Sequence, residues 1–225
     1  MKKYLTLKNI KKRVYSMFLT ESEKRHSLVG PASLWKMKQE FQINFLKAQG
    51  LAPDYKLIDI GCGTLRGGIP IIDYLNEGNY VGLEVRESVL NEGKKELKAN
   101  NLEHKNPQLI VFSNYNELSF NTSFDVLFAF SVLIHLEDSI VKDCFSFAGK
   151  NIADNGVFYA NVNIEDQTDA NWQGFPVVFR KMDFYKELAI SNGLSMNSLG
   201  VLKDLGHDSK QELADKQVML EFKKL

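Results

Sequence analysis

The sequence has few of the residues that build covalent or metal-held frameworks. Its 225 residues include two cysteines, Cys62 and Cys144, and four histidines. Two cysteines exclude a disulfide scaffold, and no compact group of His, Cys and carboxylate residues suggests a metal site, so we expect no metal. An apolar run of about 18 residues and the apolar core of a secretion signal are also absent. These absences favour a cytoplasmic protein in a reducing environment.

The chain also lacks net charge, because 28 Lys and Arg residues balance 28 Asp and Glu residues. A neutral chain has no overall field that would attract nucleic acid, and we expect no nucleic-acid partner. Hydrophobic residues make up 44% of the sequence and charged residues 25%, which is typical of a globular protein with its own core.

Positive charge is nevertheless concentrated in residues 1–20, which contain no acid. Apolar residues recur there at spacings of three and four, so a helix would carry an apolar stripe opposite a basic face. Such a helix could make weak contact with an anionic membrane surface, and the same pattern fits a helix packed on the domain or on a second subunit. The oligomeric state stays open.

The most informative stretch is KLIDIGCGTLRGG, residues 56–68, where an apolar run ends in an acid and then turns through closely spaced glycines. Without Cβ atoms, Gly61 and Gly63 let the backbone turn tightly and approach a ligand. Apolar periodicity resumes at Ile69, so the order is strand, glycine loop, helix. Nicotinamide and flavin enzymes use a similar loop to bind a pyrophosphate, and the neighbouring residues must decide between cofactors.

Two acids favour a cationic cofactor. Asp59 ends the first strand, where its charge suits the ammonium or sulfonium of S-adenosylmethionine and opposes a pyrophosphate. Glu84 ends the next apolar run, 84 − 61 = 23 residues after Gly61, close to the roughly 20-residue offset at which an acid accepts ribose hydroxyls. The alternative is an NAD(P)-dependent oxidoreductase, but the one Tyr-x-x-x-Lys spacing, Tyr4 to Lys8, precedes the loop, where it would not serve such an enzyme.

The pattern Asp59-x-Gly61-x-Gly63 followed by Glu84 resembles the first two motifs of the class I S-adenosylmethionine-dependent methyltransferases. Residues 124–136 are similar to the fourth strand of that family and its exit. Many members carry a third glycine where this chain has Leu65. The variant resembles a bacterial subgroup of small methyltransferases associated with surface-glycan or other small-molecule pathways.

From residue 56 onward, strand and helix patterns alternate, which predicts a mainly parallel sheet with helices on both faces. The resemblance implies an α/β, Rossmann-like doubly wound sheet of seven strands, with residues 194–202 and 217–222 as an antiparallel edge hairpin. Residues 1–49 are expected to form an N-terminal helical extension, with a basic segment at 1–20 and a helix at about 32–48 that covers the cofactor or substrate. Residues 50–225 would form the cofactor-binding domain, and the polar stretch 163–169 a lid or substrate loop.

Ligands of such sheets lie beyond the carboxyl ends of the strands. The glycines would approach the methionine half of the cofactor, and Glu84 would bind its ribose hydroxyls. Val85 with Asn114 or Tyr115 would flank the adenine. Phe130 with Ser131 would close the methionine side. The expected cofactor-binding residues are therefore Asp59, Gly61, Cys62, Gly63, Arg66, Glu84, Val85, Asn114, Tyr115, Phe130 and Ser131. Arg66 could pair with the cofactor carboxylate, with an anionic substrate or with surface acids.

His135 is the expected catalytic base for an alcohol acceptor, because its unperturbed pKa lies near roughly 6.5 and it follows the fourth strand. A histidine there could instead cap a helix or pack beneath the site. His207 is a second choice, and His26, Trp35 and Trp172 are expected to contact the substrate, although an aromatic residue such as Trp35 on an amphipathic helix is more often part of the core.

The sequence therefore predicts a class I methyltransferase that uses S-adenosylmethionine, releases S-adenosylhomocysteine and methylates an oxygen of a small molecule. A sugar or a cell-envelope or capsule intermediate is the acceptor that the subgroup resemblance implies. Besides the oxidoreductase, a catalytically inactive cofactor-binding protein that acts as a partner in an assembly is an alternative.

Overall fold

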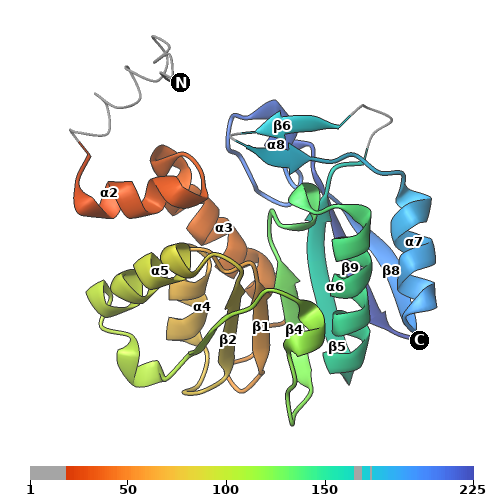
Figure 1. The fold of residues 1–225 in the computed structure, drawn as a ribbon, viewed down its shortest axis with the longest axis horizontal. Helices are drawn as coiled ribbons and strands as arrows, with labels where there is room; N and C mark the ends of the chain where they lie inside the picture. Colours follow the sequence, from red (N-terminus) through yellow and green to blue (C-terminus); the bar gives the residue numbers. More distant parts are fainter. Residues whose placement is uncertain (1–18, 165–168, 173) are drawn as a thin grey trace, which may run out of the picture.

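The computed structural model describes residues 19–164, 169–172 and 174–225. Within these ranges the main feature is a seven-stranded sheet, with helices on both faces (Figure 1). The strands are β1 (Leu57–Ile60), β2 (Tyr80–Glu84), β3 (Gln108–Val111), β4 (Phe124–Ala129), β5 (Ile152–Val162), β8 (Leu194–Val201) and β9 (Val218–Lys224). The helices are α2 (Glu21–His26), α3 (Trp35–Ala48), α4 (Gly68–Tyr74), α5 (Glu87–Ala99), α6 (Asp138–Asn151), α7 (Met182–Ser191) and the short α8 (Glu212–Asp215).

The strand order is β3-β2-β1-β4-β5-β9-β8. The first five of these strands pair in parallel, whereas β9 runs antiparallel to both of its neighbours. This is the Rossmann-like arrangement that the alternating pattern and the family resemblance predict. The antiparallel hairpin also forms as expected, with β8 at the edge and β9 inside it.

Alternation along the central strands divides the core into two layers. Ile58 and Ile60 of β1 face a cluster that contains side chains of α6 and α7, while Leu57 faces the cluster formed with α3, α4 and α5. Because successive side chains of a strand point to opposite faces, Asp59 shares the face of Leu57. The acid is thus buried on the side of the helix that follows the glycine loop.

A small hairpin, β6 (Ala170–Trp172) and β7 (Phe175–Val177), follows the polar stretch 163–169 and forms a separate two-stranded sheet. Residues 165–168 of that stretch lie outside the described residues. Lys181 holds the N-cap position of α7, and Asp183 lies in its first turn. An acid in the first turn interacts favourably with the positive end of the helix dipole.

None of the helices within the described ranges is long and apolar enough to cross a membrane. Most of the basic segment 1–20 lies outside the described residues, which begin at residue 19.

The hydroxyl of Tyr80 in β2 should stabilise the sheet through its bond to Asp59. It donates to Asp59 Oδ2 at 2.6 Å, and both side chains are buried. At pH 8, Tyr80→Phe should lower the free energy of unfolding by about 1–3 kcal/mol, because a buried carboxylate loses its partner. Urea denaturation measures this. The matched control is Tyr74→Phe, whose hydroxyl donates to the carbonyl of Leu51 at 3.0 Å; an equal loss in both variants would contradict the role of Asp59.

Candidate functional site

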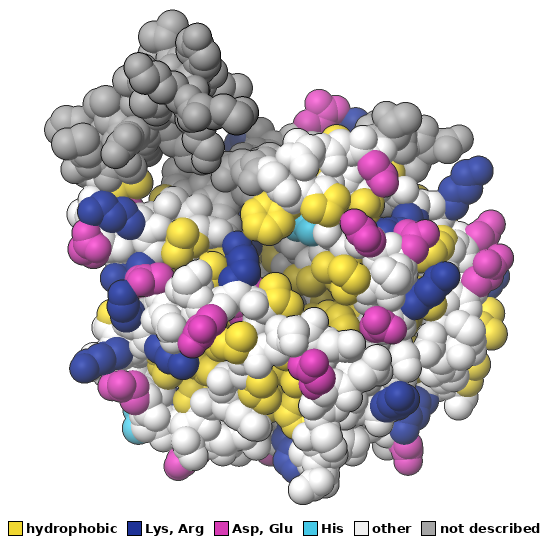
Figure 2. All heavy atoms as spheres, in the orientation of Figure 1, with side chains coloured by type: hydrophobic (Ala, Val, Ile, Leu, Met, Phe, Trp, Pro, Cys, Tyr) yellow, Lys and Arg dark blue, Asp and Glu magenta, His cyan; other side chains and the backbone are white. Residues whose placement is uncertain are grey.

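A cavity of about 470 Å³ lies at the carboxyl ends of β1, β2 and β4. Figure 2 shows a hollow on this face of the molecule with hydrophobic side chains around it. Its lining includes Gly61, Gly63, Arg66, Phe130, Ser131 and His135, which are six of the residues that the sequence selected. The topology therefore brings the glycine loop and the exit of the fourth strand into one cavity, as the parallel sheet requires.

The glycine loop is closely packed from both sides. Gly61 and Gly63 have φ values of 71° and 58°, a region that favours glycine. A Cβ at Gly61 would lie 2.6 Å from Cγ2 of Val132, and one at Gly63 would lie 2.7 Å from Cγ1 of Val29. Leu65, at the position where many family members have glycine, keeps a left-handed φ of 63° and is fully buried. The chain thus retains the turn without the third glycine.

Asp59 lies beneath this loop and lines a smaller cavity of about 30 Å³ that also borders Gly61 and Gly63. Burial raises the pKa of its carboxyl group from 3.8 to about 7, although the hydrogen bond from Tyr80 and the charge of Arg66 oppose the rise. The ionised carboxylate is therefore costly in the ligand-free protein, and a cation bound next to it would relieve that cost.

Glu84 lies at the end of β2 with a side chain that is nearly fully buried. Its Oε1 accepts hydrogen bonds from the backbone N–H of Arg86 at 3.0 Å and from Nε of Arg86 at 3.1 Å. Its Oε2 lies 3.9 Å from the point where a Cβ of Gly63 would be. One carboxylate oxygen is thus fixed by Arg86, and the other faces the glycine loop, where a hydroxyl could donate to it.

Arg66 is buried, which excludes the surface role that the sequence left open. Its Nη1 donates to the carbonyl of Val29 at 2.8 Å, and its Nε has no hydrogen-bond partner among the described residues. Burial lowers the pKa of the guanidinium to about 10, so it stays charged at neutral pH. Arg66 lines both cavities and offers a donor to a bound anion there.

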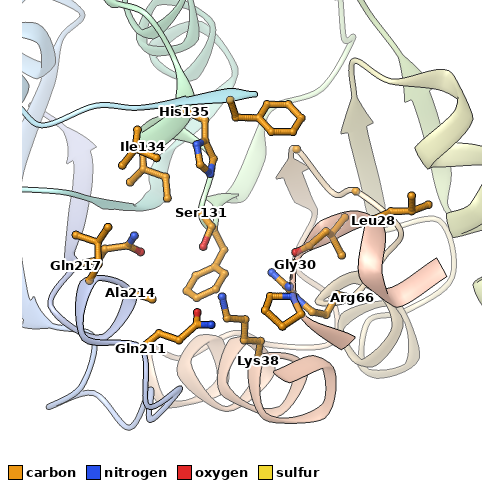
Figure 3. Close-up of a pocket in the computed structure, with 18 of the residues that line it drawn as sticks. Leu28, Gly30, Lys38, Arg66, Ser131, Ile134, His135, Gln211, Ala214 and Gln217 are labelled. Carbon is orange, nitrogen blue, oxygen red and sulfur yellow. Dashed lines mark hydrogen bonds between the residues drawn. The ribbon is translucent and has the colours of Figure 1, made fainter. Parts of the chain in front are cut away.

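His135 points into the larger cavity, as Figure 3 shows. Its Nδ1 lies 2.6 Å from the carbonyl oxygen of Pro176, at the hairpin that covers the site. Because a carbonyl only accepts, Nδ1 carries the proton and Nε2 is the basic nitrogen of the neutral ring. Burial lowers the pKa of His135 below its usual value of 6.5, and the charges of Arg86 and Lys38 act in the same direction, although the bond to Pro176 raises it.

Ser131 has a left-handed φ of 59°, which is uncommon for a residue other than glycine. Its backbone N–H donates to Oδ1 of Asn161 in β5 at 2.7 Å. This bond holds the exit of β4 in a strained turn. Strain of this kind is often found where a chain must present backbone to a ligand.

Besides Asp59 and Glu84, four expected cofactor residues do not line the large cavity. Cys62 is buried and packs within the core, although it also borders the small cavity. Tyr115 packs in the core against Phe112. Val85 is 59% exposed, and Oδ1 of Asn114 caps a short helix by accepting from the N–H of Asn116.

The expected substrate residues also differ from the sequence-based assignment. His26 and Trp35 stack on each other, with ring centroids 3.6 Å apart and an interplanar angle of 8°, and neither lines the cavity. His26 also approaches Glu96, with 3.3 Å between Nε2 and Oε1. The pair therefore fastens α2 and α3 to α5. Trp172 lies in β6, and its side chain is outside the described structure.

His207 is likewise a structural residue rather than part of the cavity wall. Its ring is buried between Phe41 and Phe130, and its Nδ1 lies 2.9 Å from Oδ1 of Asp215.

Several cavity residues carry no recognisable sequence motif. Lys38 of α3 and Gln217 next to β9 are buried polar side chains on the wall, and the segment Leu28–Pro31 covers the glycine loop. Phe175 of β7 closes another side. A polar residue on the apolar face of the expected helix 32–48 was the one signal that could have indicated Lys38.

The residues around the loop fit S-adenosylmethionine. Only glycine fits at positions 61 and 63, two buried carboxylates lie next to the loop, and the unpaired Nε of Arg66 lies at the same cavity. Asp59 and Glu84 suit the cationic groups and ribose hydroxyls of that molecule, and Arg66 suits its carboxylate. The same acids would repel the pyrophosphate of a nicotinamide cofactor.

Comparison with known proteins identifies a domain and the fold. Residues 58–158 match the family model described as a methyltransferase domain. Among solved structures, magnesium protoporphyrin IX methyltransferase from Synechocystis PCC 6803 with bound SAM superposes with a TM-score of 0.67 at 15% identity, covering 96% of this chain and 97% of that chain. The CcbJ methyltransferase from Streptomyces caelestis gives a TM-score of 0.65 at 14% identity, covering 84% and 96%.

A SAM-dependent methyltransferase from Clostridium acetobutylicum gives a TM-score of 0.63 at 12% identity, covering 97% of this chain and 99% of that chain. These structural likenesses establish the fold. The residues that match the family model include the glycine loop, Glu84 and β4. Residues 58–158 thus match a methyltransferase domain, and the chain has the fold of the S-adenosylmethionine-dependent methyltransferases of known structure.

Proposed function

We propose that this protein transfers a methyl group from S-adenosylmethionine to an oxygen atom of a small molecule, such as a sugar or a cell-envelope or capsule intermediate. The observation that carries the proposal is the position of His135, which lines the same cavity as Gly61 and Gly63 with its Nδ1 bonded to the carbonyl of Pro176. A hydroxyl acceptor needs a base at the cavity wall, and this histidine offers Nε2 in its basic form.

The bound cofactor supplies an electrophilic methyl group on its sulfonium. The protein mainly positions the two reactants, and alignment alone can contribute on the order of 7–11 kcal/mol. His135 would accept the hydroxyl proton at Nε2 as the oxygen becomes methylated. The lowered pKa keeps the ring neutral at pH 7, so it is ready to accept that proton.

The two alternatives make different predictions for ligand binding. A nicotinamide-dependent oxidoreductase would have to hold a pyrophosphate next to the buried acids Asp59 and Glu84, which is unfavourable. An inactive partner protein would bind the cofactor without turnover. Binding of cofactor and turnover of acceptor therefore separate all three functions.

Calorimetric titration tests the cofactor directly. Wild-type protein should bind S-adenosylmethionine and S-adenosylhomocysteine but not NAD(H), and Glu84→Ala should weaken adenosyl binding by about 10- to 100-fold, because hydrogen bonds from the ribose to a carboxylate are lost. Glu87→Ala is the matched control, since Glu87 is an exposed acid at the start of α5. Tight binding of NAD(H) without an adenosyl response would make hydride transfer the function.

Asp59→Asn should separate stability from cofactor binding. The raised pKa of Asp59 means that the native protein loses stability as the pH rises from about 4 to about 7, where the buried group ionises. The variant should therefore resist urea better than wild type at pH 8, and the difference should shrink toward pH 4. Its affinity for S-adenosylmethionine should fall about tenfold, because a carboxylate facing a cation is lost. A variant that gains stability at pH 8 and keeps full affinity would show that Asp59 does not face the cofactor.

His135→Gln should lower kcat by about 10²- to 10⁴-fold with little change in KM, because a general base acts in the transition state. The assay measures S-adenosylhomocysteine release with an acceptor found by screening sugars and sugar phosphates. In wild type the rate should fall on the acid side with a midpoint below pH 6.5, and this limb should disappear in the variant. The control is His104→Gln, at an exposed histidine whose Nδ1 contacts the carbonyl of Asn101.

An unchanged kcat in His135→Gln would show that His135 is not the general base. Adenosyl binding without turnover of any acceptor would support the inactive partner protein.

A further inference from the structure

Lys38 is a buried ammonium group without a carboxylate partner. Its side chain belongs to α3, is 8% exposed and points into the large cavity (Figure 3). Its carbonyl accepts a hydrogen bond from Nε2 of Gln42, but no hydrogen bond or ion pair joins its ammonium group to another described residue. Burial and the charge of Arg66 lower the pKa of Lys38 to about 8, so it is mostly charged at neutral pH. A charge in this position is costly unless a ligand pairs with it.

The acid that acts on Lys38 electrostatically is already engaged. Asp215 raises the pKa of Lys38, but its Oδ1 lies 2.9 Å from Nδ1 of His207. The same oxygen accepts from the backbone N–H of Ser209 at 2.9 Å and from its hydroxyl at 2.7 Å. This carboxylate stabilises the chain before β9 and leaves Lys38 directed toward the cavity.

A chain of hydrogen bonds fixes a second donor on the wall. The backbone N–H of Ser131 can only donate, so the atom of Asn161 that receives it is the carbonyl Oδ1. The other atom of that amide is then Nδ2, which donates to Oε1 of Gln217 at 2.6 Å. Gln217 lines the cavity, and the remaining atom of its amide is therefore an NH₂ group.

The charges around the cavity leave an excess of positive groups. Arg86 is paired with Glu84 at 3.1 Å, and Glu212, at the exposed rim, is paired with Lys216 at 2.7 Å. Arg66 and Lys38 then remain as lining cations without an ion pair among the described residues. The carboxylate of the cofactor can neutralise one of them, but its ammonium and sulfonium add further positive charge.

We propose that Lys38 and Gln217 form a subsite for an anionic group, a carboxylate or a phosphate, on the methyl acceptor. The inference rests on the proposed function and narrows its substrate class from small molecules in general to acidic ones. An ammonium and an amide NH₂ both donate, and an anion accepts from both. The apolar side chains of Ile134 and Val177, on the same cavity, offer contact to the uncharged part of such a molecule.

The test uses the full chain saturated with S-adenosylhomocysteine, with inorganic phosphate and acetate as probes in separate NMR titrations. The wild-type complex should bind at least one anion. Lys38→Met should weaken that binding by at least about tenfold, because a charge-assisted hydrogen bond is lost. Lys36→Met should leave it unchanged, since Lys36 is exposed on the same helix and lies 3.8 Å from Glu40. Binding of phosphate alone indicates a phosphate ester as acceptor, and binding of acetate alone indicates a carboxylic acid.

The affinity of Lys38→Met for S-adenosylhomocysteine separates the subsite from the cofactor site. It should stay within about twofold of wild type, which also shows that the variant folds. A large loss of this affinity would assign Lys38 to the cofactor carboxylate and overturn the proposal. So would a wild-type complex that binds neither anion, or equal anion binding in both proteins. If the wild type does not bind S-adenosylhomocysteine, the proposed function fails, and titration of the ligand-free protein still decides whether Lys38 binds an anion.

Discussion

The arrangement of the site depends on the contact of two valines with the glycine loop. Val132, just after β4, occupies the space that a side chain at Gly61 would need, and Val29 does the same at Gly63. Any larger residue in the loop would have to displace the exit of the fourth strand or the N-terminal segment that covers the loop. Interiors pack too densely to absorb such a displacement without cost. The tight turn therefore fixes how closely the glycine loop, the exit of β4 and the N-terminal segment that covers the loop approach one another at the cavity.

The electrostatics of the site follow from that packing. Asp59, Arg66 and Lys38 are buried at or next to this loop, and burial shifts the pKa of each toward its neutral form. Opposite charges compensate only in part, because Tyr80 holds Asp59 and a backbone carbonyl holds Arg66. The ligand-free protein thus carries charged groups whose partners are incomplete. A cofactor with cationic groups and a carboxylate supplies the complementary charges, so binding relieves a cost that folding alone leaves.

The fold was largely predictable, because apolar runs that alternate with helical patterns mark the strands of the large sheet. The small hairpin β6–β7 was not, since each of its strands has only three residues and the pattern is too short to register. Gly61, which follows β1, and Ser131 and His135, which lie in the segment after β4, line the cavity as the sequence predicts. Tyr115 does not line it, because this residue begins the short 3-10 helix Tyr115–Glu117 and its ring fills the core.

The polar wall of the cavity could not be read from motifs because it comes from tertiary structure. The parallel strands end at the cavity, but β9 runs in the opposite direction, so it is the start of β9 that lies at that edge. This brings Gln217 next to Asn161 of β5, whose amide also holds the strained turn at Ser131. The antiparallel strand therefore lets residues near the C-terminus reach the cavity beside the glycine loop. The same hydrogen bonds join Gln217 to the turn that precedes Val132, and Val132 packs on Gly61, so the C-terminal segment and the glycine loop are linked through the exit of β4.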